Sequence, residues 1–230
     1  FVNDVPKYAR NPTLARVMRH CIEAGPHAAG ERIKFEGFGQ SNYKSREAGE
    51  GLRTLERAML LYLLYPSTQT APPFEPDCRK SPRLQLIDTG LVNFLAGAQR
   101  SLIGVGDLGA LYRGRIIEQA AGQELLAAGS PIHRKPLFWV REKGTANAEV
   151  DFVAPWRNSV LPVEVKSGPV GKLKSLHQFI ERTGVNAAVR LHASPIHVEK
   201  CTTPGGARFL LINLPYYLGP LAVEYADWAS

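Results

Sequence analysis

The sequence predicts an α/β fold in which a small helical segment precedes a larger domain built on a mixed β-sheet. Apolar residues at helical spacing dominate the first 60 residues. From about residue 107 the pattern changes to helix, three strands, helix and further strands, an order typical of a mixed sheet. Prolines between 72 and 82 and glycines between 97 and 109 mark the change in composition. We therefore expect two domains, at residues 1–100 and 101–230.

The composition is that of an ordinary folded protein. Of 230 residues, 44% are hydrophobic and 21% are charged, which argues against disorder. No apolar run approaches the roughly 20 residues that span a bilayer, so we expect a cytoplasmic protein without a membrane partner. Cys21, Cys78 and Cys201 stand far apart, which predicts reduced thiols rather than disulfides or a zinc site. Because the chain begins with Phe1, we expect it to be part of a longer protein.

The net charge of +7, with a pI near 9.4, is compatible with a polyanionic partner, above all nucleic acid. Many basic proteins bind no nucleic acid, so the charge alone leaves the partner open.

The first segment has the element order of a winged helix. A helix is expected from about 11 to 25, where Asn-Pro-Thr offers a start and glycine a stop. A second helix is expected to begin with Ser45 as its cap. A buried strand at 60–65 ends at a proline, and a second strand follows at 84–87.

Three arginines, Arg46, Arg53 and Arg57, recur at near-helical spacing on the second helix. In a DNA complex such a helix can enter the major groove, with its arginines near phosphates or guanines. The alternative is a solvated face on a helix that only packs against a neighbouring domain. Lys172 and Lys174 are further candidate contacts to nucleic acid.

The second segment alternates helices and strands. We expect a helix from about 108 that ends near Gly129, a strand at 137–140, and a hairpin of strands 150–153 and 161–165 joined by a turn at 155–159. A helix over 173–182, stopped by Gly184, and strands at 187–191 and 209–214 complete the domain.

The hairpin carries an unusual set of charges, in the sequences EVDFV and PVEVKSG. Strand residues two apart share a face, so Glu164 and Lys166 point the same way and Val163 and Val165 point into the core. Asp151 lies beside them if the strands pair in matching register. Two carboxylates and a lysine then converge at the end of a sheet. A surface ion cluster is the alternative.

Oxygen ligands of this kind suit Mg²⁺ or Mn²⁺. Asp151, Glu164 and the Val165 carbonyl are candidate ligands, and Glu118 on the preceding helix could reach the same ion. Lys166 would orient a water molecule or stabilise charge on a phosphodiester.

The arrangement D-x(12)-E-x-K resembles the PD-(D/E)XK restriction-endonuclease-like superfamily. A closer likeness is to a C-terminal domain of unknown function that follows the ATPase module in many prokaryotic AAA-type ATPases. The blocks KSPRLQLIDTGLVNFL, GALYRGRIIEQ, PLFWVRE, EVDFV and PVEVKSG carry it, over about 79–168. The stretch FEGFGQSNYKSREAGEGLRTLERAMLLYLLYPS resembles the winged-helix segment that joins the ATPase to that domain.

The resemblance implies a restriction-endonuclease-like domain of α-β-β-β-α-β order. It implies that Asp151, Glu164 and Lys166 are catalytic and that Glu118, Asp151 and Glu164 bind metal. Gln178 matches a glutamine of some nuclease branches, but the tyrosine that usually accompanies it is missing. Val150 stands where the motif has proline.

The resemblance also implies an ATPase module before Phe1, because this chain has no P-loop motif and we expect no ATP site in it. The predicted function is a divalent-metal-dependent DNA nuclease domain. The alternatives are a nuclease-like module that binds nucleic acid without cutting it, and an interaction module that regulates the missing ATPase. The sequence leaves the oligomeric state open.

Overall fold

The computed structural model describes residues 2–95, 115–128, 135–143, 146–166 and 173–230. These residues form two compact units, and each is described by itself. One unit contains residues 2–64 and those from 81 to 95; the other contains residues 65–80 and those from 115 onward. The segment 65–80, which the sequence analysis assigned to the first domain, therefore packs with the second unit. The expected boundary near residue 100 lies outside the described residues and stays a prediction.

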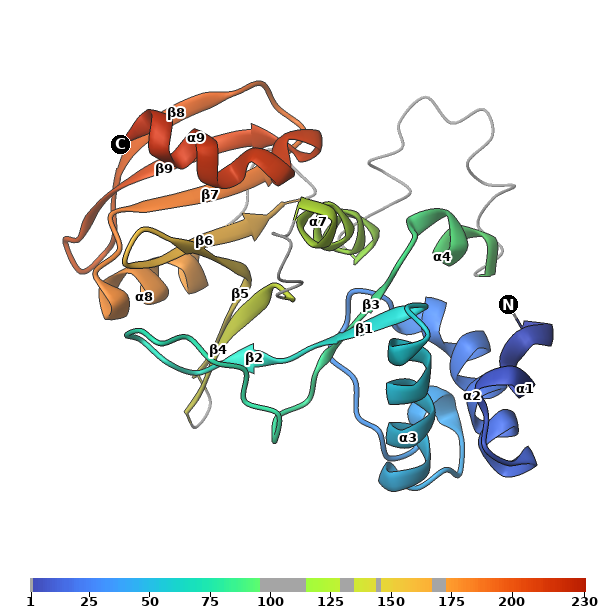
Figure 1. Cartoon of the computed structure of the whole chain (residues 1–230). Coiled ribbons are helices and arrows are strands. Elements are labelled where there is room, and N and C mark those ends of the chain that lie inside the picture. The colour runs from blue at the N-terminus through green and yellow to red at the C-terminus, as the bar shows by residue number, and fades with distance from the viewer. Residues whose placement is uncertain (1, 96–114, 129–134, 144–145, 167–172) are drawn as a thin grey trace. The chain divides into compact units, whose positions relative to one another are not determined.

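The first unit is mainly helical (Figure 1). It contains α1 (Val5–Tyr8), α2 (Pro12–Ala24), α3 (Ser45–Arg57), the strands β1 (Leu61–Leu64) and β3 (Arg83–Leu86), and α4 (Thr89–Leu95). The two strands pair antiparallel, with Leu61 opposite Leu86. The predicted helices and strands of this segment are thus present. The helix–helix–strand–strand order agrees with the expectation, while the winged-helix assignment itself stays a prediction.

The two long helices of this unit begin in different ways. Asn11 caps α2 as expected, because its side-chain oxygen accepts a hydrogen bond from the Leu14 N–H at 2.8 Å. Ser45 was expected to cap α3, and this is wrong: Lys44 is the cap residue and Ser45 is the first helical residue. Two carboxylates accept the exposed N–H groups instead, Glu47 from Lys44 at 2.9 Å and Glu36 from Ser45 at 2.6 Å. Negative charge at a helix N-terminus is favourable, so these two carboxylates can take the place of a serine cap.

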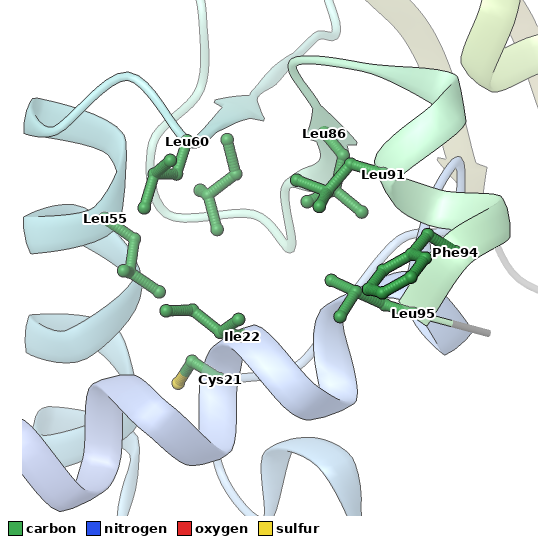
Figure 2. Close-up of a pocket in the computed structure, with 9 residues that line it drawn as sticks. Cys21, Ile22, Leu55, Leu60, Leu86, Leu91, Phe94 and Leu95 are labelled. Carbon is green, nitrogen blue, oxygen red and sulfur yellow. The ribbon is translucent and has the colours of Figure 1, made fainter. Parts of the chain in front are cut away.

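An apolar cavity of about 160 Å³ lies inside the helical unit. Figure 2 shows Leu55 and Leu60 on one side of it and Leu91 and Phe94 across from them. Cys21 stands in its wall, and burial raises the pKa of that thiol to about 12. A protonated thiol among leucines is a poor nucleophile, so Cys21 is not a candidate catalytic residue.

The second unit is built on a seven-stranded mixed sheet with the order β2-β4-β5-β6-β7-β9-β8 (Figure 1). The strands are β2 (Pro66–Ser67), β4 (Leu137–Lys143), β5 (Ala146–Trp156), β6 (Ser159–Val165), β7 (Ala187–His192), β8 (His197–Thr202) and β9 (Arg208–Pro215). Its helical segments are α7 (Arg115–Ala128), α8 (Lys174–Thr183), η4 (Tyr216–Leu221) and α9 (Ala222–Ala229). The predicted α/β class with a mixed sheet is confirmed. None of the helices in the described residues is long and apolar enough to cross a membrane.

Strand direction changes across this sheet. Strands β4, β5 and β6 pair antiparallel, whereas β6, β7 and β9 run parallel and β8 closes the edge antiparallel to β9. Helix α8 buries Leu176, Phe179 and Ile180 in a core cluster with residues of the sheet, including Trp139 and Val150. The three buried positions of α8 are those that its spacing predicts.

Three features of this unit differ from the sequence expectations. The edge strand β8 was not predicted, because polar and apolar residues do not alternate regularly along it and most of them are exposed. The helical segments after residue 215 were also missed. The hairpin turn is shorter than expected: β5 continues to Trp156, and only Arg157 and Asn158 form the turn. Trp156 is buried and donates a hydrogen bond to Asp227 at 2.8 Å, which anchors the strand end.

Gly184 stops α8 as predicted, in the left-handed conformation with φ 71° and its N–H bonded to the Ile180 carbonyl. A Cβ at this position would meet nothing within 4 Å, so glycine is favoured here only by its left-handed backbone conformation and not by lack of space. We predict that Gly184→Ala destabilises this unit by about 1 kcal/mol and that Gly184→Asn costs less. All three tryptophans lie in this unit, so tryptophan fluorescence during urea unfolding reports on it alone. Equal stability of the alanine variant and the wild type would contradict the prediction.

Candidate active site

The hairpin register brings the two strand acids together. Phe152 pairs with Val163 in the antiparallel β5–β6 ladder, so the next position in the same register joins Asp151 to Glu164. The Asp151 carboxylate accepts a hydrogen bond from the Val165 N–H at 2.8 Å. Lys166 Nζ donates to Glu164 Oε1 at 2.5 Å. The structure thus gathers the three residues that the strand pattern grouped.

Glu164 is far more buried than the sequence suggested. Its side chain is 5% exposed, against 26% for Lys166. The other oxygen, Oε2, is buried and has no hydrogen-bond partner among the described residues. The interpretation as a surface ion cluster is therefore wrong for Glu164. A buried carboxylate oxygen without a partner is unfavourable unless something binds there.

Electrostatics identify the neighbours of Glu164. Burial, and then the negative charge of Asp151, raise the pKa of its carboxyl to about 8, although Lys166 acts in the opposite direction. The charge of Glu118 on α7 also raises this pKa, so the helix acid acts on the same group. For Lys166, burial lowers the pKa, but attraction to Glu164 and their hydrogen bond raise it more, and the net direction is upward. The ammonium group therefore stays charged among three acids.

The backbone of Lys166 is held from two sides. Its N–H donates to the Leu191 carbonyl on β7 at 2.9 Å, and its carbonyl accepts a hydrogen bond from the Tyr216 hydroxyl. Sequence reasoning missed Tyr216, which follows β9 and lies 50 residues from Lys166. No local pattern signals such a contact. The tyrosine and β7 together orient the strand end that carries the lysine.

The donor atoms fit a hard divalent cation in kind. Within the described part of the chain, no three His, Cys, Asp or Glu side chains are arranged to hold a metal ion as they stand. The unpartnered Oε2 of Glu164, close to the charges of Asp151 and Glu118, is nevertheless the kind of atom that a cation satisfies. Carboxylate oxygens are the ligands that Mg²⁺ and Mn²⁺ prefer. Asp151, Glu164 and Glu118 are therefore the residues that would hold such an ion.

The predicted nucleic-acid contacts lie elsewhere. Arg46, Arg53 and Arg57 are exposed on α3, in the helical unit. Arg57 donates to Thr54 at 2.8 Å, and the Arg53 guanidinium lies 5.6 Å from the centre of the Phe35 ring. The three arginines and the acidic site thus belong to different units.

Two residues near α8 have different environments. Lys174 is exposed at the first position of α8, whereas Lys172 lies outside the described residues. Gln178 accepts a hydrogen bond from Arg141 at 2.9 Å, which ties α8 to β4. This contact gives Gln178 a structural role.

Comparisons with known proteins match two parts of the chain. Residues 113–210 are similar to a domain of unknown function (DUF4143), which is found in proteins associated with AAA-type ATPases. Residues 2–102 are similar to a second domain of unknown function (DUF8612). The predicted likeness to an ATPase-associated domain is confirmed at this level. The searches of curated proteins and of solved structures found no match.

The raised pKa of Glu164 makes the stability of the sheet unit depend on pH. From pH 4.5 to about 8 the folded carboxyl keeps a proton that the unfolded chain has released, so stability falls as pH rises. We predict that Glu164→Gln removes roughly 2–4 kcal/mol of this decline. Urea unfolding followed by tryptophan fluorescence at pH 5 and pH 8 measures it. The same decline in both proteins would show that another group causes it.

Proposed function

We propose that the sheet unit is a divalent-metal-dependent nuclease domain that hydrolyses phosphodiester bonds of DNA. The observation that carries the proposal is the buried Glu164, which pairs with Lys166, lies beside Asp151 and leaves Oε2 without a partner among the described residues. Like charges gathered in a buried place destabilise a fold. Strongly shifted pKa values with specific charged partners are typical of functional sites.

Each residue has a distinct role in this proposal. Asp151 and Glu164 hold the ion, and Glu118 lies at the same site. A bound Mg²⁺ or Mn²⁺ would neutralise phosphate charge and make a water molecule more acidic. Lys166 carries a fixed positive charge toward the oxygens of the phosphate, where negative charge grows during the reaction. The hydrogen bonds from Tyr216 and to Leu191 hold the backbone that positions the lysine.

The other parts of the molecule support a DNA substrate. The net charge of +7 favours a polyanion. The order of elements α7-β4-β5-β6-α8-β7 agrees with the α-β-β-β-α-β order that the resemblance implies. In the helical unit, the exposed arginines of α3 would contact DNA in the manner of a winged helix. The similarity of residues 113–210 to an ATPase-associated domain supports an ATPase module as a partner within a longer protein.

A second candidate function is a nuclease-like module that binds nucleic acid or regulates the ATPase module without cutting DNA. The contact between Lys166 and Glu164 favours it, because the lysine occupies the Oε1 atom that an ion would also use. Cleavage and ion binding separate the two candidates.

We predict that Asp151→Ala and Lys166→Ala both abolish cleavage for different reasons. Loss of Asp151 removes a ligand, so affinity for Mn²⁺ falls at least tenfold together with activity. Loss of Lys166 removes charge stabilisation but no ligand, so Mn²⁺ still binds and cleavage falls at least a hundredfold. Plasmid nicking and calorimetric Mn²⁺ titration measure the two effects.

Lys200→Ala is the matched control, because Lys200 is exposed on the edge strand β8 and should retain full activity. A wild-type protein that cuts neither duplex, single-stranded nor branched DNA with Mg²⁺ or Mn²⁺ would favour the module without catalysis. Normal cleavage by both site variants would refute the proposed roles.

Binding to DNA should weaken steeply with salt, because bound lysines and arginines release condensed counterions. We predict that Arg53→Ala with Arg57→Ala reduces the slope of log affinity against log salt by about 2. Arg16→Ala with Arg19→Ala removes the same charge from exposed positions on α2 and should change the slope little. Fluorescence anisotropy with a labelled duplex measures both. Equal changes in slope for the two double variants would contradict a specific role of α3 and would show that only the overall positive charge attracts DNA.

A further inference from the structure

A second polar cluster lies on the neighbouring strands of the same sheet. Arg190 on β7 pairs with Asn213 on β9, and Asn213 pairs with His197 on β8. His192 and Glu199 each follow two residues later on β7 and β8, so strand alternation places them on the same face. The cluster therefore joins an inner strand to the edge strand β8 across β9.

Glu199 is at the centre of the contacts. Its Oε1 atom accepts hydrogen bonds from Asn213 at 2.7 Å and from Arg190 at 3.1 Å. The same oxygen lies 3.1 Å from His197 Nε2. The other ring nitrogen of His197, Nδ1, lies 3.0 Å from the Pro195 carbonyl.

These distances require a positive group between His197 and Glu199. A carbonyl oxygen only accepts, so Nδ1 of His197 carries the proton that bonds to Pro195. In a neutral ring, Nε2 then presents its lone pair to the Glu199 carboxylate, and two acceptors repel each other at this distance. Either a second proton or a metal cation resolves the conflict.

His192 adds a third potential ligand. His192 is 2% exposed, and neither nitrogen of its ring has a hydrogen-bond partner among the described residues. Burial lowers the pKa of the imidazole, and the charges of Arg190 and His197 lower it further. A buried imidazole nitrogen without a hydrogen bond is the kind of atom that a cation satisfies. Its centre lies 5.7 Å from that of the His197 ring.

We propose that His192, His197 and Glu199 bind a transition-metal ion of the zinc class. Two imidazoles and one carboxylate are a donor set typical of zinc. The surrounding hydrogen bonds are those that orient such ligands: Pro195 fixes the His197 ring, while Arg190 and Asn213 hold Glu199. The ion would tie β8 to β7 across the intervening strand.

Binding requires a small change in side-chain position. In the described residues no three ligand side chains are placed to hold an ion as they stand, so at least one of them, for example the His192 ring, must turn. Turning breaks no hydrogen bond with a described residue, because neither nitrogen has one. With each nitrogen about 2.0 Å from a tetrahedral ion, two imidazole centres lie roughly 5–6 Å apart, close to the present spacing.

The site is separate in its chemistry from the acidic cluster around Glu164. Nitrogen donors select zinc, cobalt or copper, whereas an all-oxygen set suits Mg²⁺ and Mn²⁺. The proposal therefore holds whether or not the protein cuts DNA.

The test is titration of the whole chain with Zn²⁺ by calorimetry and with Co²⁺ by visible absorption. We expect one Zn²⁺ per chain at micromolar or tighter affinity and Co²⁺ bands of a site with nitrogen ligands. His192→Gln and His197→Gln should each weaken Zn²⁺ binding at least tenfold. His27→Gln, which changes an exposed histidine of the helical unit, and Glu164→Gln should not weaken it.

Hydrogen exchange gives an independent readout, because Zn²⁺ should slow exchange of the β8 amides in the wild type but not in His197→Gln. His197 is half exposed, so this variant keeps the test valid even if the His192 variant does not fold. Absence of Zn²⁺ binding would overturn the proposal and leave a proton between His197 and Glu199. Binding that survives both histidine changes, or that Glu164→Gln abolishes, would overturn it as well.

Discussion

The burial of one carboxylate constrains the rest of the sheet unit. Glu164 stands between Val163 and Val165, which are both in the core, so the strand cannot move outward without exposing them. Removing a carboxylate from water costs several kcal/mol unless partners compensate. Lys166 supplies one partner, and Asp151 is held in place by the Val165 N–H. The contact with Lys166 and the placement of Asp151 beside the strand end thus surround that one buried group.

The direction of the strands explains where the polar groups gather. Strands β6, β7 and β9 run parallel, so their carboxyl ends lie at the same edge of the sheet. Binding sites in parallel sheets form at such ends, because the chain leaves the strands there and the side chains are not covered by a crossover. Glu164 lies in the last two residues of β6, Lys166 follows that strand directly, and His192 ends β7. The acidic cluster and the histidine cluster thus both lie at the carboxyl ends of the parallel strands of one sheet.

The features that suggest a nucleic-acid protein are divided between the two units. The arginines of α3 are exposed in the helical unit, whereas the carboxylates and lysine are in the sheet unit. Exposed charge attracts a polyanion over a long range, while a buried charge acts on groups in contact with it. The two parts of the proposed function therefore rest on different physics, and each can fail without the other.

The sequence by itself determined the secondary structure of most elements and the face on which Glu164 and Lys166 lie. Both depend on local rules: the periods of helices and strands, the cap at Asn11 and the stop at Gly184. It did not determine β8, whose mixed residues give no period. Only the tertiary structure decided how deeply Glu164 is buried, that Tyr216 holds the Lys166 backbone, and that the His192 ring lies against the His197 ring. These facts depend on which strands become neighbours, and alternation along one strand specifies the face of a residue but not the strand beside it.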